Sequence, residues 1–262
     1  MKTRSTQKHF APFAAAGLIF SAFAFTVTPV SAEEMRLYAA AGLKAPVIDL
    51  ARDYEKASGH KITLVFDTAG AAEQKFLADS GATFLLTTQT RIRDAEKNGK
   101  LKGGVTNVVG DTVAGFAATP DKTKPDISTS EKLKAALLAT PRIAFSDPAR
   151  GATVGAHFMK VIETLGIKDE VLKKTTLARD GIETMRLVLA GEVDLGITQI
   201  SEVVQSNRDA LVGPFPPEFD LSTTYSLWLR KDAPAAAKAF ARLITSPAER
   251  ARLIEHGLRP PA

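Results

Sequence analysis

From residue 35 onward, short apolar runs alternate with helical patterns, and this alternation restricts the fold more than any other feature of the chain. The apolar runs Met35–Ala39, Ile62–Phe66 and Phe84–Leu86 have the length of buried strands. Between them, Pro46–Ser58 and Ala71–Ala78 carry apolar residues at helical spacing. Strand, loop and helix repeated with short links predict a mainly parallel sheet with helices on its faces, which is an α/β fold.

Two proline-rich stretches, 119–129 ("TPDKTKPDIST") and 211–220 ("LVGPFPPEFD"), divide this pattern. Strands and helices resume between them, and a last strand with two helices follows the second stretch. We therefore expect two lobes, each a mainly parallel sheet flanked by helices, joined by two crossover segments above a cleft. The expected boundaries are 33–112 plus 215–262 for lobe 1 and 113–214 for lobe 2.

Residues 1–32 have the pattern of a cleavable export signal. Lys2, Arg4 and Lys8 precede the apolar segment Phe10–Val27, and small residues at 30–32 match the site that signal peptidase requires. A retained membrane anchor is the alternative, but proline, glycine and serine interrupt the apolar run. The sequence thus predicts a periplasmic protein with no stable membrane insertion, which we expect to be a monomer.

Charge and cysteine content exclude several functions. Without residues 1–32, the 34 Lys and Arg fall to 31 against 29 Asp and Glu, so the net charge drops from +5 to +2. Such a nearly neutral chain lacks the clustered basic face of a nucleic-acid binder. The chain has no cysteine, which excludes disulfides, thiolate metal sites and a cysteine-linked lipid anchor.

Motifs for catalysis, nucleotides and metals are missing from the sequence. There is no G-x-S-x-G, Walker or G-x-G-x-x-G pattern, and the histidines are not paired at metal-ligand spacing. His157 alone lies beside a candidate loop, where surface or packing roles are the simpler interpretation. We therefore predict no catalytic residue, no metal site and no cofactor.

Five loops of small residues lie where an expected strand meets the next helix. They are 40–42, 67–71, 146–155, 178–184 and 198–201. Free backbone N–H groups and the positive end of a helix dipole occupy such positions, and glycine or alanine lets an anion approach them closely. Any single loop is also explained by tight strand–helix packing. Together the five loops favour an anion held mainly by neutral dipoles.

Three stretches carry a resemblance to a known family. The stretches are "LYAAAGLKAPVIDLARDYEKASGHKITLVFDTAG", "RIAFSDPARGATVGAHFMKVIETLGI" and "GEVDLGITQISEVV", and the tail "AKAFARLITSPAERARLIEHGL" adds to them. In this order the chain resembles the periplasmic molybdate-binding proteins of ABC transporters, within the type II solute-binding superfamily. The resemblance implies a two-lobed periplasmic-binding-protein fold, a closing hinge and delivery of a small anion to the transmembrane subunits of an ABC permease.

The resemblance also implies ligand contacts, with departures from the family pattern. Serine hydroxyls of the family's first two loops are replaced here by Gly42 and by Thr68 or Ala69, and a tyrosine of some members is replaced by Gln199. Backbone amides, or the side chains of Thr68, Thr153, Thr198 or Gln199, would have to compensate. The expected ligand-binding residues are Ala41, Gly42, Thr68, Ala69, Gly70, Arg150, Thr153, Val154, Gly181 and Gln199.

Two further interpretations remain open. Arg150 and Arg179 could clamp a carboxylate bidentately, so the ligand could be a small di- or tricarboxylate. An enzyme acting on a small organic acid is the alternative from a different class, with Asp67, Asp147 or Asp180 as its acid or base. The effector domain of a transcription factor shares this fold type, but the export signal and the lack of a helix-turn-helix speak against it.

Overall fold

The computed structural model describes Met1 and residues 32–260, so residues 2–31 of the predicted export signal lie outside the described residues. Residues from Ala32 onward form one compact unit. Within the described part of the chain, no helix is both long enough and apolar enough to cross a bilayer.

Nine strands and ten α-helices are found among residues 32–260, joined by short 3₁₀ turns. The strands are β1 (Glu34–Ala40), β2 (Lys61–Asp67), β3 (Phe84–Thr88), β4 (Gly104–Ala118), β5 (Ile143–Ser146), β6 (Thr175–Ala178), β7 (Leu195–Gln199), β8 (Leu211–Pro214) and β9 (Ser222–Arg230). The helices are α1 (Lys44–Ser58), α2 (Ala69–Ala78), α3 (Gln89–Lys97), α4 (Ser130–Ala139), α5 (Thr153–Thr164), α6 (Lys168–Leu172), α7 (Gly181–Leu189), α8 (Ile200–Asn207), α9 (Ala235–Ile244) and α10 (Arg250–Glu255).

The strands follow the order β2-β1-β3-β9-β4-β7-β5-β6, and β8 pairs with β4. The outer strands pair in parallel, as the strand–helix alternation predicts: β2 with β1, β1 with β3, β7 with β5, and β5 with β6. The central strands β9 and β4 pair antiparallel with their neighbours. The α/β class predicted from the sequence is therefore confirmed, with an antiparallel centre between two parallel ends.

Strand β4 connects the two parts of this sheet. Its first part, Gly104–Val113, pairs with β9, and its last residues, Ala114–Ala118, pair with β7. The polar Thr106 and Asn107 interrupt the apolar pattern in the first part of β4. Those residues are exposed or half-buried and belong to the antiparallel ribbon with β9. One continuous strand thus runs through both halves of the sheet.

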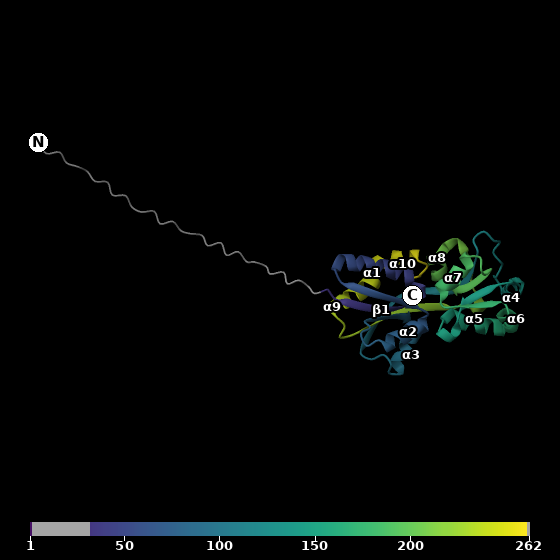
Figure 1. Cartoon of the computed structure of the whole chain (residues 1–262), viewed down its shortest axis with the longest axis horizontal. Coiled ribbons are helices and arrows are strands. Elements are labelled where there is room, and N and C mark those ends of the chain that lie inside the picture. Colours follow the sequence, from purple (N-terminus) through teal and green to yellow (C-terminus); the bar gives the residue numbers. More distant parts are fainter. Residues whose placement is uncertain (2–31, 261–262) are drawn as a thin grey trace. The chain divides into compact units, whose positions relative to one another are not determined.

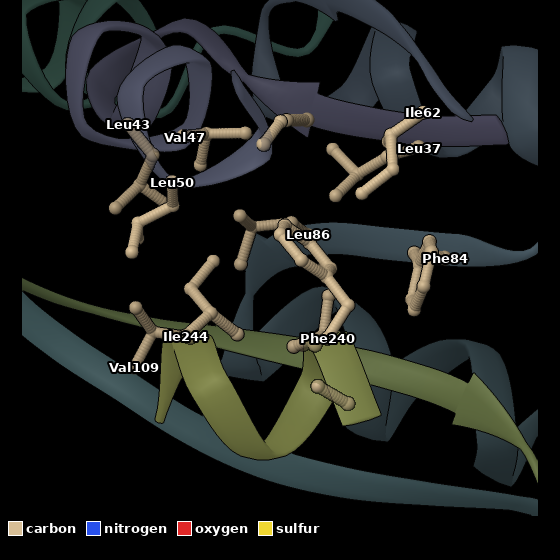
Figure 2. Packing of buried hydrophobic residues seen from close by; sticks show 14 of the residues in the cluster. Leu37, Leu43, Val47, Leu50, Ile62, Phe84, Leu86, Val109, Phe240 and Ile244 are labelled. Atoms are coloured by element: carbon tan, nitrogen blue, oxygen red, sulfur yellow. The ribbon is translucent and has the colours of Figure 1, made fainter. Parts of the chain in front are cut away.

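Helices cover both faces of each half. Around β1, α1 and α10 lie on one side of the sheet and α2 and α3 on the other (Figure 1). Helices α1, α9 and α10 contribute to one hydrophobic cluster, and α2 and α3 contribute to another. In the first cluster, Leu37 of β1 and Leu86 of β3 are completely buried against Val47 of α1 and Phe240 of α9 (Figure 2). The return of the chain to this core after β8 places β9 between β3 and β4.

The other half has its own two clusters. Residues of α4, α5 and α6 pack with β5 and β7 around Phe116, Phe145 and Phe158, all without exposed surface. Residues of α7 and α8 form the second cluster with Met185 and Val203. We call the half around β1 lobe 1 and the half around β5 lobe 2; the residue boundaries expected above remain a prediction.

Candidate functional site

A small buried cavity lies where residues of the two lobes meet. Its volume is about 30 Å³, which is room for about two water molecules. Its lining residues come from β1 and the turn after it, from β5, β7 and β9, and from the first residues of four helices. They are Ala40, Ala41, Gly42, Thr68, Ala69, Ser146, Ala152, Thr153, Val154, Gly181, Thr198, Gln199, Glu202 and Tyr225.

The N-termini of α2, α5, α7 and α8 all border this cavity. The first N–H groups of a helix have no acceptor within the helix, and the helix dipole makes this end positive. Thr68 caps α2 by accepting the N–H of Ala71, and Asp180 caps α7 by accepting the N–H of Glu183. Helix α5 begins after Ala152 and has no side-chain cap. Its first amides therefore remain to be satisfied from the cavity side.

The structure brings eight of the ten residues predicted to bind ligand to the wall of this one cavity. They are Ala41, Gly42, Thr68, Ala69, Thr153, Val154, Gly181 and Gln199. Gly70 and Arg150 are absent from the lining. The N–H of Gly70 donates to the carbonyl oxygen of Gly151 at 3.1 Å, and the Arg150 guanidinium binds Asp67 at 2.9 Å. Whether the eight residues bind a ligand stays a prediction.

Tyr225 of β9 was not expected at the site, because its strand lies far along the chain and reads as an ordinary buried strand. A Cβ atom at Gly42 would overlap the Tyr225 hydroxyl. The hydroxyl thus fills the space that a side chain at position 42 would take. Burial and the nearby Glu202 raise the pKa of Tyr225, so the hydroxyl keeps its proton at neutral pH. A hydroxyl from another strand therefore lies beside Gly42, where the family resemblance leads us to expect a serine hydroxyl.

Glu202 is the second unexpected residue of the lining. It occupies the first turn of α8, and its Oε2 accepts hydrogen bonds from the Thr198 hydroxyl and from the N–H of Gln199, the latter at 3.2 Å. Burial raises the pKa of Glu202 to about 7, against the lowering effect of these two donors. In the sequence, a glutamate three residues after a helix cap is explained by the capping of the helix alone. Nothing in the sequence therefore marks Glu202 as a residue of the site.

Gly181 is required for this arrangement. A Cβ atom at residue 181 would overlap both the Glu202 carboxyl and the Thr198 hydroxyl. The glycine at the start of α7 therefore lets the helix approach α8 and the cavity closely. The Thr198 hydroxyl, considered as a compensating donor, is occupied by Glu202.

The acid–base candidates taken from the sequence do not line the cavity. Asp67 binds Lys75 and Arg150, Asp147 accepts the N–H of Ala149 at 2.9 Å, and Asp180 caps α7. Neither arginine considered for a carboxylate clamp lines the cavity, and Arg179 is largely exposed and pairs with its neighbour Asp180. His157 Nε2 lies 2.8 Å from the carbonyl oxygen of Phe219, outside the cavity. Glu202 is the carboxyl group that lines it.

Several hydrogen bonds join the lobes beside the cavity. The Thr68 hydroxyl donates to the Arg150 carbonyl oxygen, and Arg150 also forms an ion pair with Asp67. On the other side, Gln205 of α8 donates to the Gly42 carbonyl oxygen and accepts the N–H of Ala45, both at 2.7 Å. The cavity is therefore enclosed by contacts that cross from one lobe to the other.

Comparison with known proteins shows similarity along most of the chain. An aconitate isomerase from a Pseudomonas species is 23% identical over 258 residues, which cover 93% of this chain and 95% of that protein. The molybdate-binding protein ModA of Azotobacter vinelandii is 25% identical over 182 residues, 68% of this chain and 69% of that protein.

The solved structure of the periplasmic molybdate-binding protein of Azotobacter vinelandii superposes with a TM-score of 0.68 at 18% identity. The matched region covers 87% of this chain and all of that structure. This likeness confirms the periplasmic-binding-protein fold expected from the sequence. The model of one family, described as bacterial extracellular solute-binding protein, matches residues 35–259. The chain therefore belongs to the family of bacterial extracellular solute-binding proteins.

Proposed function

We propose that this protein is the solute receptor of an ABC importer and captures a small oxyanion, such as molybdate, in the cavity between its lobes. The observation that carries the proposal is the convergence of four helix N-termini on one buried cavity. The uncapped start of α5 supplies N–H donors there, and the Tyr225 hydroxyl lies where a side chain at residue 42 would extend. Such groups stabilise an anion without a basic side chain.

The size of the cavity favours an inorganic anion. About 30 Å³ is far below the several hundred cubic ångströms of pockets that hold drug-sized organic ligands. Family membership and the similarity to molybdate-binding proteins support the same choice. In this proposal the loaded, closed receptor docks on the permease in the periplasm and releases the anion there.

Isothermal titration of the purified protein with molybdate, tungstate, sulfate and phosphate tests the proposal. We expect one site per chain and a thermal midpoint that rises with the concentration of the bound anion. Absence of binding for all four anions would contradict it. Binding of di- or tricarboxylates alone would identify the ligand as an organic acid.

A second function is favoured by Glu202 together with one relative. A carboxyl group whose pKa lies at about 7 can both give and take a proton at neutral pH. The aconitate isomerase relative extends over nearly the whole of both chains. The second candidate is therefore an enzyme that moves a proton on a small organic acid, after the lobes open further to admit it. Incubation with cis- and trans-aconitate, followed by proton NMR, tests this; interconversion that Glu202→Gln abolishes would support it, and unchanged substrate would exclude this reaction.

A further inference from the structure

The charge around the cavity is unusual for an anion site. Of the fourteen lining residues, only Glu202 and Tyr225 are ionisable, and none is Lys, Arg or His. The arginines of the neighbouring loops are engaged elsewhere, Arg150 by Asp67 and Arg91 by Glu73. An ionised Glu202 would thus face a bound anion with no cation in the lining to balance the repulsion.

One oxygen of the Glu202 carboxyl is available to a ligand. Oε2 accepts the two hydrogen bonds from Thr198 and Gln199. Within residues 32–260 no hydrogen bond to Oε1 is found, although the residue is only 6% exposed and lines the cavity. The Gln199 side chain also lines the cavity: it is 3% exposed, and its Nε2 donates to the Thr223 hydroxyl at 2.9 Å.

We propose that Glu202 holds the anion through one shared proton, so that binding of an anion without a proton of its own takes up one proton from solution. The inference rests on the proposed function as an anion receptor. For molybdate, the carboxylate, one proton and the dianion combine to give a neutral carboxylic acid whose O–H donates to an oxyanion oxygen. For hydrogen phosphate, the phosphate O–H donates to the carboxylate and no proton is taken up.

The surroundings of Glu202 support a proton held near neutral pH. Burial is the main cause of the raised pKa, and the negative charge of Asp180 adds to it. Tyr225 does not titrate in this range, because its own pKa is raised. The other charged residues on elements packed against α8 are Glu183 and Arg186 of α7, which pair with each other, Asp111 of β4, and Arg208 and Asp209 after α8.

The proposal predicts how affinity depends on pH. Below pH 7 Glu202 already carries the proton, so the Kd for molybdate changes little there. Above pH 7 each unit should weaken molybdate binding about tenfold, because the proton must be taken from solution. Hydrogen phosphate should show no such loss between pH 8 and 9.

Titration of the whole protein with sodium molybdate between pH 6 and 9 tests this, in pairs of buffers with different ionisation enthalpies. The expected result for the wild type is uptake of close to one proton per anion at pH 8 to 9. Glu202→Gln, which always donates from its amide, should bind with a pH-independent Kd and no proton uptake. Glu183→Gln, a carboxyl change on the neighbouring helix outside the cavity, should behave as the wild type does.

Molybdate binding by the wild type with no proton uptake at pH 8 to 9 would overturn the inference. The same pH slope in Glu202→Gln would also overturn it. The wild-type measurement is decisive even if the variant fails to fold. If no anion binds at any pH, the proposed function itself fails, which is a different outcome from pH-independent binding.

Discussion

Gly42 and Tyr225 are distant in sequence but adjacent in the structure, and the tyrosine supplies the hydroxyl beside the glycine. Gly42 offers only its backbone, and the Tyr225 hydroxyl lies where a side chain at position 42 would extend. The family resemblance predicts that Gly42 lacks a serine hydroxyl, but no sequence pattern predicts Tyr225 beside it, because nothing local links a residue after β1 to one on β9. The pairing exists only once β9 has returned between β3 and β4.

Tyr225→Phe should therefore weaken anion binding while the fold is kept. Loss of one hydrogen bond to a charged ligand costs about 1.5–3 kcal/mol, or about 10- to 150-fold in Kd.

Gly42→Ser alone should lower the thermal midpoint, because its Cβ collides with the tyrosine hydroxyl. The double variant Gly42→Ser with Tyr225→Phe should recover part of both losses. Titration and thermal melting measure these effects; equal affinity of Tyr225→Phe and wild type would show that the hydroxyl does not contact the anion.

At the scale of elements, the sequence predicted helix starts to within about two residues for α1 and α2, because strand ends, caps and glycines mark helix boundaries locally. The helices expected over Pro46–Ser58 and Ala71–Ala78 are α1 and α2, which end where predicted and begin two residues earlier. The single turn α6 and the strand β8, inside a proline-rich stretch, were not predicted. Both are too short to show a period of their own, and pairing with β4 defines β8. Eight of the ten expected ligand residues gather at one cavity because strand-to-helix loops of both lobes meet there.

The contribution of the first N–H of α5 to anion binding can be tested by substitution of Thr153. Thr153 is the first residue of the helix, where proline is well tolerated, and Ala152 before it is already extended with φ −71° and ψ 118°. Thr153→Pro should therefore keep the helix but remove one N–H from the cavity. We expect little change in the melting temperature without ligand and about 10- to 150-fold weaker anion binding.

The matched control is Thr153→Ala, which removes the hydroxyl and keeps the N–H. It should lose less affinity than Thr153→Pro if the helix amide is the donor. An equal loss in both variants would assign the contact to the hydroxyl instead.

At the scale of the molecule, one ion pair between the lobes can be removed without the other contacts between them. Asp67 of β2 is almost fully buried and binds Lys75 within lobe 1 at 2.7 Å and Arg150 of lobe 2 at 2.9 Å. Arg150→Ala removes the contact that crosses the lobes, and Lys75→Ala removes a similar ion pair that does not. We expect Arg150→Ala to increase the radius of gyration in small-angle scattering and to weaken anion binding by about 2- to 10-fold. Lys75→Ala should leave the radius unchanged; equal effects would mean that Asp67 acts within lobe 1 only.

Protonation of Asp67 at acid pH should separate the lobes, because it breaks the ion pair with Arg150. Burial alone would raise the pKa of Asp67, but the hydrogen bonds from Lys75, the Thr68 N–H and Arg150 together lower it. Because the pKa of Asp67 is lowered in the folded protein, its ion pairs stabilise the folded state fully above the unfolded pKa of about 3.9. This stabilisation is lost only as the pH falls through the folded pKa. The contact between the lobes should therefore persist from pH 6 to 9, so a change in affinity over that range belongs to Glu202 and not to closure.

Scattering of the ligand-free protein should show a constant radius down to about pH 4 and an increase below it, whereas Asp67→Asn should show a larger radius already at neutral pH. A wild-type radius that changes between pH 6 and 9 would contradict this separation of the two carboxyl groups.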